Sequence, residues 1–484
     1  MGIGKNFLYS SVLTASNYLF PFILYPYVLR TLGVENIGVC DFVDSIINYF
    51  VLFSMLGISI VGVREIAQAN VDKDRLNNVF TSLIILNGIT TVIAVIGLVL
   101  AVYFIPALEA YKEMLFIGII KLVGNFLLIE WFYKGIENFK YITIRTVVVK
   151  TAFLISVFVF VRNASDYKVY YFCYAMMYAL NAVINCLYAS KIVRFSINKL
   201  QFLPLIKPFV IMGVYLILTS MYTTFNSAYL GFACSTTQVG YYTTASKMFT
   251  LLLAIYTAFT VVMLPRMSAL LAQNRKEEFK ALIVKSVDAL LCVSIPIIVF
   301  SAIFAPELIA FIAGDGYEGS ISPARVVMPL VFIIGYEQIL VIQTLMPLKK
   351  DKVILTNSLI GATVGILMNV LMVKALQSTG SSIAWLLSEI AVLISAQYYV
   401  KKYHEIKFPF KKLFVNVIAY VPCVALLIAL TTLTDMAPIG TLTVAMVILI
   451  IYVAGVQYIW LKNEVFMQVV KRSVAVLNIK SGKA

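Results

Sequence analysis

Long apolar runs recur along the chain, and short polar segments separate them. Each run is about as long as the ~20 helical residues that cross the ~30 Å hydrocarbon core of a bilayer. A membrane barrel would instead show short strands of alternating polarity, and this chain lacks that pattern. The runs therefore predict an all-α, polytopic membrane protein. Fourteen spans are expected, near 7–29, 39–63, 79–103, 114–133, 142–161, 168–190, 208–230, 239–263, 283–305, 324–347, 353–373, 380–400, 413–433 and 439–461.

The composition leaves no room for a soluble domain between these spans. Hydrophobic residues make up 61% of the 484 residues and charged residues only 13%, with a mean hydropathy of +0.94. Soluble domains are about one quarter charged. The first span starts soon after Met1, and no small-residue cleavage site follows it before the next polar loop. We therefore expect a retained helix and not a signal peptide.

The basic residues are distributed unevenly among the loops. Most of the 38 Lys and Arg residues fall in every second loop and at the two chain ends, and the loops between them hold few. Cytoplasmic loops carry such an excess of positive charge. The pattern predicts that both termini lie in the cytoplasm. The net charge of +15 is then a topology signal and does not indicate nucleic-acid binding.

Sparse matches indicate an internal repeat. A shift of 202 residues places Gly38 on Gly240 and Arg64 on Arg266, and a shift of 200 aligns residues 104–106 with 304–306. The repeat predicts two parallel six-helix lobes, an N-lobe at 1–200 and a C-lobe at 201–405. Helices 13 and 14 and a cytoplasmic tail follow at 406–484. Parallel repeats of this kind are an architecture of alternating-access transporters, although accidental matches between apolar sequences would look the same.

Three stretches resemble a known family. The stretch from Tyr25 to Ala67 contains R-x-L-G, a helix bearing Tyr-Phe and a G-x-R-x-I-A exit, and 261–272 and 311–327 continue the likeness. In these motifs the chain resembles the bacterial polysaccharide repeat-unit flippases. Those proteins belong to the multidrug, oligosaccharidyl-lipid and polysaccharide (MOP) exporter superfamily.

The resemblance implies a function. Such flippases move undecaprenyl-diphosphate-linked oligosaccharides from the cytoplasmic to the periplasmic leaflet of the bacterial inner membrane. They serve O-antigen, capsule or exopolysaccharide assembly. The resemblance also implies membrane lipids as partners, contacts with the polysaccharide polymerase and chain-length machinery, and no cofactor.

Two departures from the family pattern bear on the substrate. Many of these flippases are described with twelve helices, whereas fourteen is characteristic of the peptidoglycan-precursor flippase. That relative carries arginines inside its first helix. Residues 7–28 of this chain contain none, which argues against peptidoglycan precursor as the cargo.

Charged residues inside predicted spans are the candidate site, because charges facing lipid are costly. Asp41 and Asp44 share one helix face with Asn48, and Lys247 aligns with Ser45 under the 202-residue shift. Cations in a cavity would bind the diphosphate of the cargo. The candidates for substrate binding are Asp41, Asp44, Asn48, Lys121, Lys247, Arg30, Arg64 and Arg266, and those for ion coupling are Asp41, Asp44 and Glu337.

A structural alternative stands beside each of these assignments. Intramembrane ion pairs that only fix helix packing, such as Asp44 with Lys247 or Lys121 with Glu337, would place the same residues in the spans. For Glu389 the structural interpretation is favoured. Arg64 and Arg266 end the repeated helices, where they either attract the diphosphate or anchor the helices, and Arg30 is either an outer gate or a headgroup anchor. Tyrosines in the first, second and eighth spans are candidates for stacking on sugars.

The sequence argues against an enzyme. Its single histidine, His404, lies in a basic loop, and no glycine-rich phosphate loop is present. The six cysteines stand singly without metal-site spacing, so neither a metal nor a cofactor is expected. A proton- or sodium-coupled multidrug or metabolite antiporter of the same superfamily is the main alternative function. A channel and a non-transporting scaffold are further ones.

Overall fold

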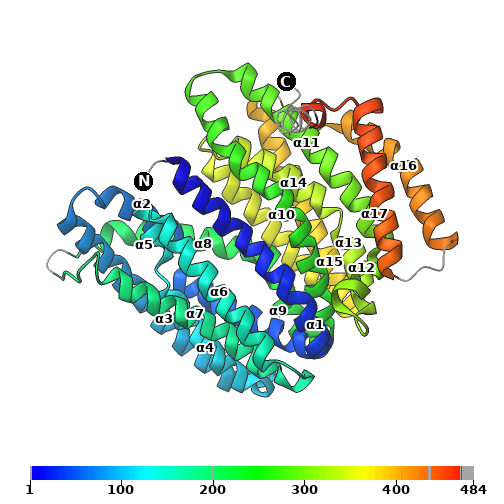
Figure 1. Cartoon of the computed structure of the whole chain (residues 1–484). Helices are drawn as coiled ribbons and strands as arrows, with labels where there is room; N and C mark the ends of the chain where they lie inside the picture. The colour runs from blue at the N-terminus through cyan, green and yellow to red at the C-terminus, as the bar shows by residue number, and fades with distance from the viewer. Residues whose placement is uncertain (1–2, 198–199, 405, 434–437, 469, 471–484) are drawn as a thin grey trace, which may run out of the picture. The chain divides into compact units, whose positions relative to one another are not determined.

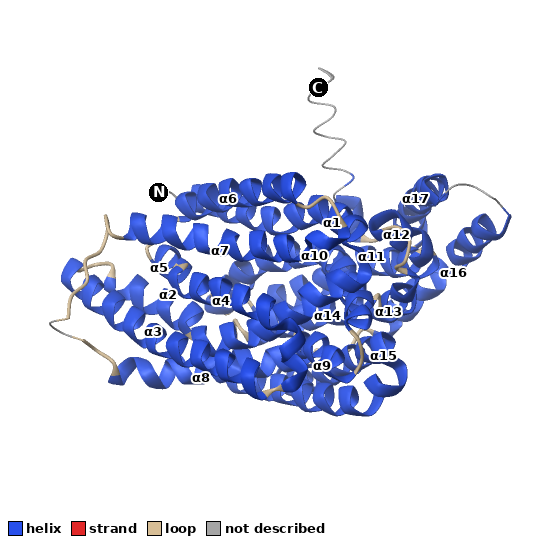
Figure 2. Cartoon of the chain, turned by 90° about the horizontal axis from the view of Figure 1, so that it is seen from below, coloured by secondary structure: helices blue, strands red, loops and turns tan. Residues whose placement is uncertain are grey.

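The computed structural model describes residues 3–197, 200–404, 406–433, 438–468 and 470. Every regular element in this part of the chain is a helix (Figure 2), as expected for consecutive bilayer-length apolar segments. The helices divide by their contacts into two compact units, unit 1 at Met1–Thr243 and unit 2 at Thr244–Ala484. The predicted all-α fold is confirmed. The lobe boundaries rest on the sequence repeat and stay a prediction.

Unit 1 contains the helices that form the candidate site (Figure 1). α4 lies beside α7, and α1 contacts α3, α4 and α6. The α-helices are α1 Ile3–Met55, α2 Ile58–Ala69, α3 Lys73–Phe104, α4 Lys112–Leu127, α5 Glu130–Gly135, α6 Phe139–Phe160, α7 Tyr167–Ala189, α8 Leu203–Thr223, α9 Phe225–Ala233 and the start of α10, Thr236–Ala272. Short 3-10 turns, η1 Pro106–Tyr111 and η2 Ala164–Asp166, precede α4 and α7.

Unit 2 begins within α10. Its core is formed where α11 and α15 pack against α14. The elements are α11 Lys276–Ile303, α12 Ala305–Ala313, η3 Glu318–Ser320, α13 Ile321–Val327, α14 Leu330–Leu340, η4 Val341–Leu345, α15 Asp351–His404, α16 Phe410–Leu433, α17 Pro438–Gly455 and η5 Val456–Trp460.

Two very long helices each hold two predicted spans. The described residues include 12 helical stretches apolar enough to cross a membrane, and the longest measure 61 and 53 residues. Each is about two and a half to three times the ~20 residues that a bilayer requires. α1 is broken at Gly33, where φ is 75°, and α15 at Gln377, where φ is 52°. Both breaks fall between neighbouring predicted spans, so all fourteen predicted spans lie on described helices.

Several predicted spans are less regular than expected. The span 39–63 is interrupted where α1 ends at Met55 and α2 begins at Ile58, and 114–133 is interrupted at Ile129, whose φ is 38°. Pro21 and Pro26 lie inside the first span, but the helix continues through both, and the break comes at Gly33. Hydropathy predicts which segments are apolar enough to cross the membrane, but it does not predict where the backbone turns within a segment.

Glycines allow two helices of unit 1 to approach at backbone distance. A Cβ atom on Gly38 of α1 would lie 1.8 Å from the Thr236 carbonyl oxygen of α10, and one on Gly240 would lie 2.3 Å from the Val34 carbonyl oxygen. The 202-residue shift maps Val34 onto Thr236 and Gly38 onto Gly240. The two contacts are therefore equivalent under the sequence repeat, and neither glycine has space for a side chain.

Candidate functional site

A buried lysine stands at the centre of unit 1, between α1 and α4. The Lys121 ammonium of α4 donates to Asp44 Oδ1 at 2.6 Å and to Asn48 Oδ1 at 2.8 Å, both on α1. Asn48 Nδ2 donates in turn to Asp44 Oδ2 at 3.1 Å, which closes the triad. The Lys121 side chain is 3% exposed and that of Asp44 is 20% exposed. The triad is thus a desolvated ion pair whose anionic end reaches the surface.

Two tyrosines of α7 cover the same ammonium group. Lys121 Nζ lies 5.0 Å from the ring centroid of Tyr174 and 5.3 Å from that of Tyr178. The two hydroxyl oxygens are 3.4 Å apart, and the rings meet edge to face. Aromatic faces attract a cation at this range, and more strongly when water is excluded. The site therefore combines a cation, a carboxylate, an amide and two aromatic surfaces.

Small residues bring the three helices together here. A Cβ atom on Gly118 of α4 would lie 2.4 Å from Ile47 Cδ1 of α1. One on Gly124 would lie 3.0 Å from the backbone of Tyr178 on α7. Lys121 lies between these two glycines in the sequence, and α4 therefore approaches α1 and α7 closely on both sides of it. Tight packing on both sides shields the Lys121 ammonium from water.

Unit 2 contains a second group of buried polar side chains. The carboxyl groups of Glu337 on α14 and Glu389 on α15 lie within hydrogen-bonding range of each other. Trp385 Nε1 donates to Glu389 Oε1 at 2.9 Å, and Gln338 Nε2 donates to Thr257 Oγ1 at 3.0 Å. Glu337 Oε2 is buried without a hydrogen-bond partner among the described residues. Two facing carboxyl groups can hold one proton between them, which gives this pair the chemistry of a proton site.

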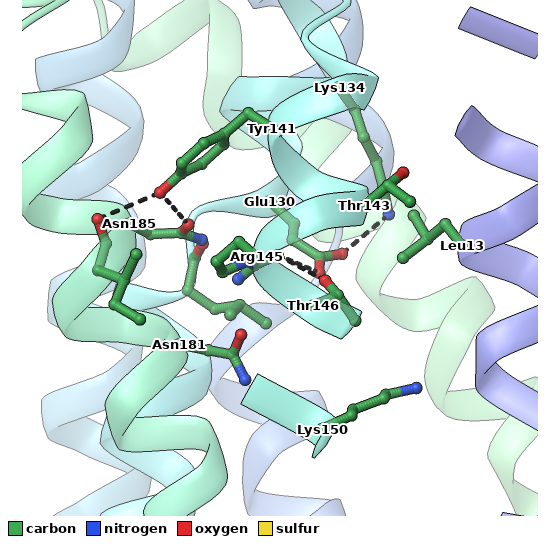
Figure 3. Close-up of polar contacts among 12 residues, drawn as sticks. Leu13, Glu130, Lys134, Tyr141, Thr143, Arg145, Thr146, Lys150, Asn181 and Asn185 are labelled. Atoms are coloured by element: carbon green, nitrogen blue, oxygen red, sulfur yellow. Dashed lines mark hydrogen bonds and ion pairs between the residues drawn. The ribbon is translucent and has the colours of Figure 1, made fainter. Parts of the chain in front are cut away.

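A third polar cluster lies around α5, α6 and α7 (Figure 3). Arg145 Nη2 donates to Glu130 Oε1 at 3.1 Å, and Lys134 Nζ lies 3.1 Å from the other oxygen of Glu130. Tyr141 donates its hydroxyl to Asn185 Oδ1 at 3.0 Å. Arg145 lies on α6, and its side chain is 2% exposed. The neighbouring carboxylate and the aromatic packing explain why an arginine is buried there.

The other predicted site residues differ in how far they are exposed. Asp41 is half-buried one turn before Asp44 and acts on Lys121 through its charge. Lys247 is half-buried on α10. The exposed residues are Arg30, Arg64 and Arg266, and Arg64 pairs with its neighbour Glu65 at 2.9 Å. The sequence suggested two structural pairings, Asp44 with Lys247 and Lys121 with Glu337. The ion pair in unit 1 joins Asp44 with Lys121.

Sequence reasoning missed Tyr174 and Tyr178. The tyrosines proposed for stacking include several with packing roles: Tyr27 donates to the Val161 carbonyl at 2.6 Å, and Tyr256 donates to that of Ser286 at 3.2 Å. A signal was present in the sixth predicted span, where tyrosines recur at 170, 171, 174 and 178. Spacings of three and four place such residues on one helix face.

The described residues contain no group of three or more His, Cys, Asp or Glu side chains that could hold a metal ion. None of the described cysteines forms a disulfide bond. The polar chemistry of the described spans therefore comes from amine, guanidinium, carboxyl, amide and phenol groups.

Comparisons with known proteins identify the family and the fold. The model of the family described as "Polysaccharide biosynthesis protein" matches residues 3–271, more than half of the chain. A protein of Escherichia coli (strain K12) named "Putative O-antigen transporter" is 26% identical over 356 residues, which cover 72% of this chain and 84% of that protein. A protein of Shigella dysenteriae with the same name is 24% identical over 398 residues, covering 81% and 98%.

Two solved structures share the fold. The lipid II flippase MurJ in an inward closed conformation has a TM-score of 0.75 at 14% identity and covers 93% of this chain and 99% of its own. An inward-facing multidrug resistance MATE family transporter of the MOP superfamily has a TM-score of 0.63 at 12% identity, covering 79% and 94%. All four of these proteins are named as transporters or flippases, and none of the four as an enzyme. The chain is a polytopic membrane protein with the MOP fold, and it belongs to the polysaccharide biosynthesis protein family.

Proposed function

We propose that this protein is a flippase for polyprenyl-diphosphate-linked oligosaccharides. The observation that carries the proposal is the Lys121 ammonium, held by Asp44 and Asn48 and covered by two tyrosine rings within unit 1. The cargo has a lipid tail that stays in the bilayer, an anionic diphosphate and a hydrated sugar. A buried cation beside aromatic faces suits the last two groups.

The diphosphate of the cargo would replace the Asp44 carboxylate as the partner of Lys121. When its carboxylate takes up a proton, its hold on Lys121 weakens and the ammonium becomes available to a diphosphate oxygen. When the cargo leaves, the proton leaves with it or after it, and the ion pair re-forms. Asp41, one turn away, would tune this exchange. In this scheme Asp44 couples an ion to transport by alternating access between the two leaflets.

The names of the relatives support a setting for this activity. The relatives in Escherichia coli and Shigella dysenteriae are each named "Putative O-antigen transporter". We propose a bacterial cytoplasmic membrane, with both termini in the cytoplasm as the loop charges predict. The cargo would then move outward for assembly of O-antigen, capsule or exopolysaccharide, and the polymerase and chain-length machinery would receive it.

Glu337 is proposed as a second coupling residue. Its carboxyl group and that of Glu389 lie together inside unit 2, where one proton can be shared. Glu337→Gln should therefore reduce the stimulation of transport by an imposed pH gradient, with Asp44 carrying the remainder, and leave the stimulation by an imposed potential unchanged. If Glu337→Gln responds to the pH gradient as the unaltered protein does, Glu337 is not a coupling residue.

The test of the main proposal separates charge from packing. A fluorescent polyprenyl-diphosphate oligosaccharide is followed across proteoliposomes containing the unaltered protein or the double variant Asp44→Asn with Lys121→Gln. The double variant can keep a hydrogen bond between positions 44 and 121 but has no charge. If the pair only holds α1 to α4, stability and transport both survive. If the pair binds the diphosphate during transport, the Tm of the double variant stays near that of the unaltered protein while its transport rate falls about 100-fold.

A matched control uses another ion pair of the same length. Lys412 and Asp288 in unit 2 are also 2.6 Å apart, with side chains 43% and 25% exposed. Asp288→Asn with Lys412→Gln should leave transport unchanged. Failure of the unaltered protein to move any lipid-linked sugar would overturn the proposal and favour an antiporter of the same superfamily, with cationic small molecules as the next cargo to test.

A further inference from the structure

The Arg145 cluster borders a pocket that the proposed transport site does not use. The pocket has a volume of about 440 Å³ and lies along α6 and α7. Arg145, Lys140, Tyr141 and Tyr188 contribute its polar and aromatic wall, and Ile144 and Val148 its apolar wall. Pockets of a few hundred cubic ångströms accommodate small polar groups such as a lipid headgroup.

The guanidinium group of Arg145 has donors to spare. One nitrogen, Nη2, donates to Glu130 and to the Thr146 hydroxyl at 3.1 and 3.2 Å. The other two, Nε and Nη1, are buried and have no hydrogen-bond partner among the described residues. The side chain is 2% exposed, so these donors are removed from water at a free-energy cost. An anionic oxygen bound here would satisfy them.

Charge around the pocket also favours an anion. Residues 130–150 contain four basic side chains, Lys134, Lys140, Arg145 and Lys150, against two acidic ones, Glu130 and Glu137. Glu130 already accepts from both Arg145 and Lys134. Lys140 is exposed at the pocket rim, where its ammonium is available to a ligand. The excess positive charge complements a phosphate.

The surroundings of the pocket are those of a lipid-facing surface. Ile144 and Val148 of α6 are 50% and 59% exposed, and Val183 and Leu187 of α7 are 54% and 65% exposed. Exposed aliphatic side chains on bilayer-length helices are expected to contact acyl chains. Tyr141 and Tyr188 stack at 4.1 Å between centroids and close the polar end of the pocket. The pocket therefore offers both the polar and the apolar contacts that an amphipathic ligand requires.

We propose that this pocket binds the headgroup of an anionic phospholipid, with the phosphate at Arg145 and Lys140 and the acyl chains over Ile144 and Val148. Basic pockets between transmembrane helices on the cytoplasmic side bind such headgroups. The loop charges predict that this end of α6 faces the cytoplasm. The inference is independent of the proposed transport activity, because its residues are separate from Asp44, Asn48 and Lys121.

The test measures lipid binding by native mass spectrometry of the purified full-length protein. Phosphatidylglycerol and phosphatidylethanolamine with identical acyl chains are titrated separately. The unaltered protein should bind phosphatidylglycerol about tenfold more tightly, and Arg145→Gln should lose that preference. Because Arg145→Gln leaves Glu130 with one partner fewer and can fold poorly, Val148→Trp serves as a second variant that fills the pocket mouth without changing a charge.

Matched controls and competitors complete the design. Lys140→Gln should weaken phosphatidylglycerol binding about threefold, whereas Lys73→Gln, at an exposed lysine on α3, should not. The proposal is overturned if the unaltered protein shows no preference, or if Val148→Trp and well-folded Arg145→Gln both retain it. It is also overturned if inorganic phosphate or undecaprenyl phosphate displaces the phospholipid at equal concentration, because the site would then serve free anions or the transport cargo.

Discussion

Tyr174 and Tyr178 present aromatic faces to Lys121 at 5.0 and 5.3 Å from the ammonium nitrogen. Neither hydroxyl donates to the ion pair in the described hydrogen bonds, and their shared contact is with each other at 3.4 Å. The rings therefore contribute the stabilisation of the cation, and the phenol oxygens are secondary. This division can be tested with conservative substitutions.

Tyr174→Phe should behave like the unaltered protein, whereas Tyr174→Leu should lower the free energy of unfolding by about 1–2 kcal/mol through loss of the cation–π contact. Thermal unfolding in detergent measures both. Tyr170→Leu is the control on the same helix, since the Tyr170 ring lies beside Phe153 at 6.5 Å. A Tyr174→Phe protein as unstable as Tyr174→Leu would show that the hydroxyl and not the ring matters.

The sequence identified which polar residues lie inside the spans, but it did not show which of them contact one another. Asp44, Asn48 and Lys121 were recognisable because charged and amide groups are costly in lipid. Their mutual contacts depend on the rotation of α4 against α1, which no local pattern records. The burial of Arg145 is hidden for a related reason: it depends on the position of Glu130, which is 15 residues away in the sequence.

At the scale of elements, two backbone breaks allow one continuous helical stretch to hold two spans. Gly33 has φ 75° and ψ 166°, a conformation that is open mainly to glycine. Gln377 has φ 52° and ψ −126°, which is strained for a residue with a Cβ atom. Each break lies near the middle of its helix, but the break in α1 is at a glycine and the break in α15 is at a glutamine.

Substitutions at these positions should have opposite effects. Gly33→Ala should reduce the free energy of unfolding by about 1–2 kcal/mol from backbone strain alone, because a Cβ atom there would meet nothing within 4 Å. Gln377→Gly should raise it by about 1 kcal/mol. Denaturant or thermal titration of both variants decides the matter. An unchanged Gly33→Ala protein would mean that the break can relax into another conformation.

The hydropathy pattern predicted the breaks at Gly33 and Gln377, but it did not predict the interruptions inside other spans. Residues 33 and 377 fall in gaps between predicted spans, because polar or small residues lower the hydropathy there. The interruptions at 56–57 and 129 lie inside apolar stretches. Such turns are fixed by tertiary contacts, for example between Gly57 and the backbone of Phe209 on α8, and these contacts join residues far apart in the sequence.

At the scale of the whole molecule, the paired glycine contact links the start of the second predicted span to the start of the eighth. A Cβ atom on Gly38 would lie 1.8 Å from the Thr236 carbonyl oxygen. Because the obstacle is backbone, the helices must separate to accommodate it. A methyl group at this position therefore forces the two helices apart and costs packing contacts along both of them.

Gly38→Ala should lower the free energy of unfolding by about 1–3 kcal/mol, because atoms inserted between tightly packed helices force them to shift, and thermal unfolding in detergent measures the change. Gly240→Ala should have the same effect because its contact is the repeat equivalent. Gly455→Ala is the control, since a Cβ atom at that position meets nothing within 4 Å. A Gly38→Ala protein as stable as the unaltered one would show that the two helices are not tightly packed at this contact.

The Asp44–Lys121 pair has a consequence for biosynthesis. Its members are 77 residues apart, and ribosomes add about 5–20 residues per second, so roughly 4–15 seconds pass between their syntheses. During that interval α1 carries Asp41 and Asp44 without the lysine that pairs with one of them. A helix with two carboxylates is a poor substrate for direct release into lipid. Its partition from the translocon should therefore wait for α4, and nascent chains that stop before Lys121 should remain at the insertion machinery or be degraded.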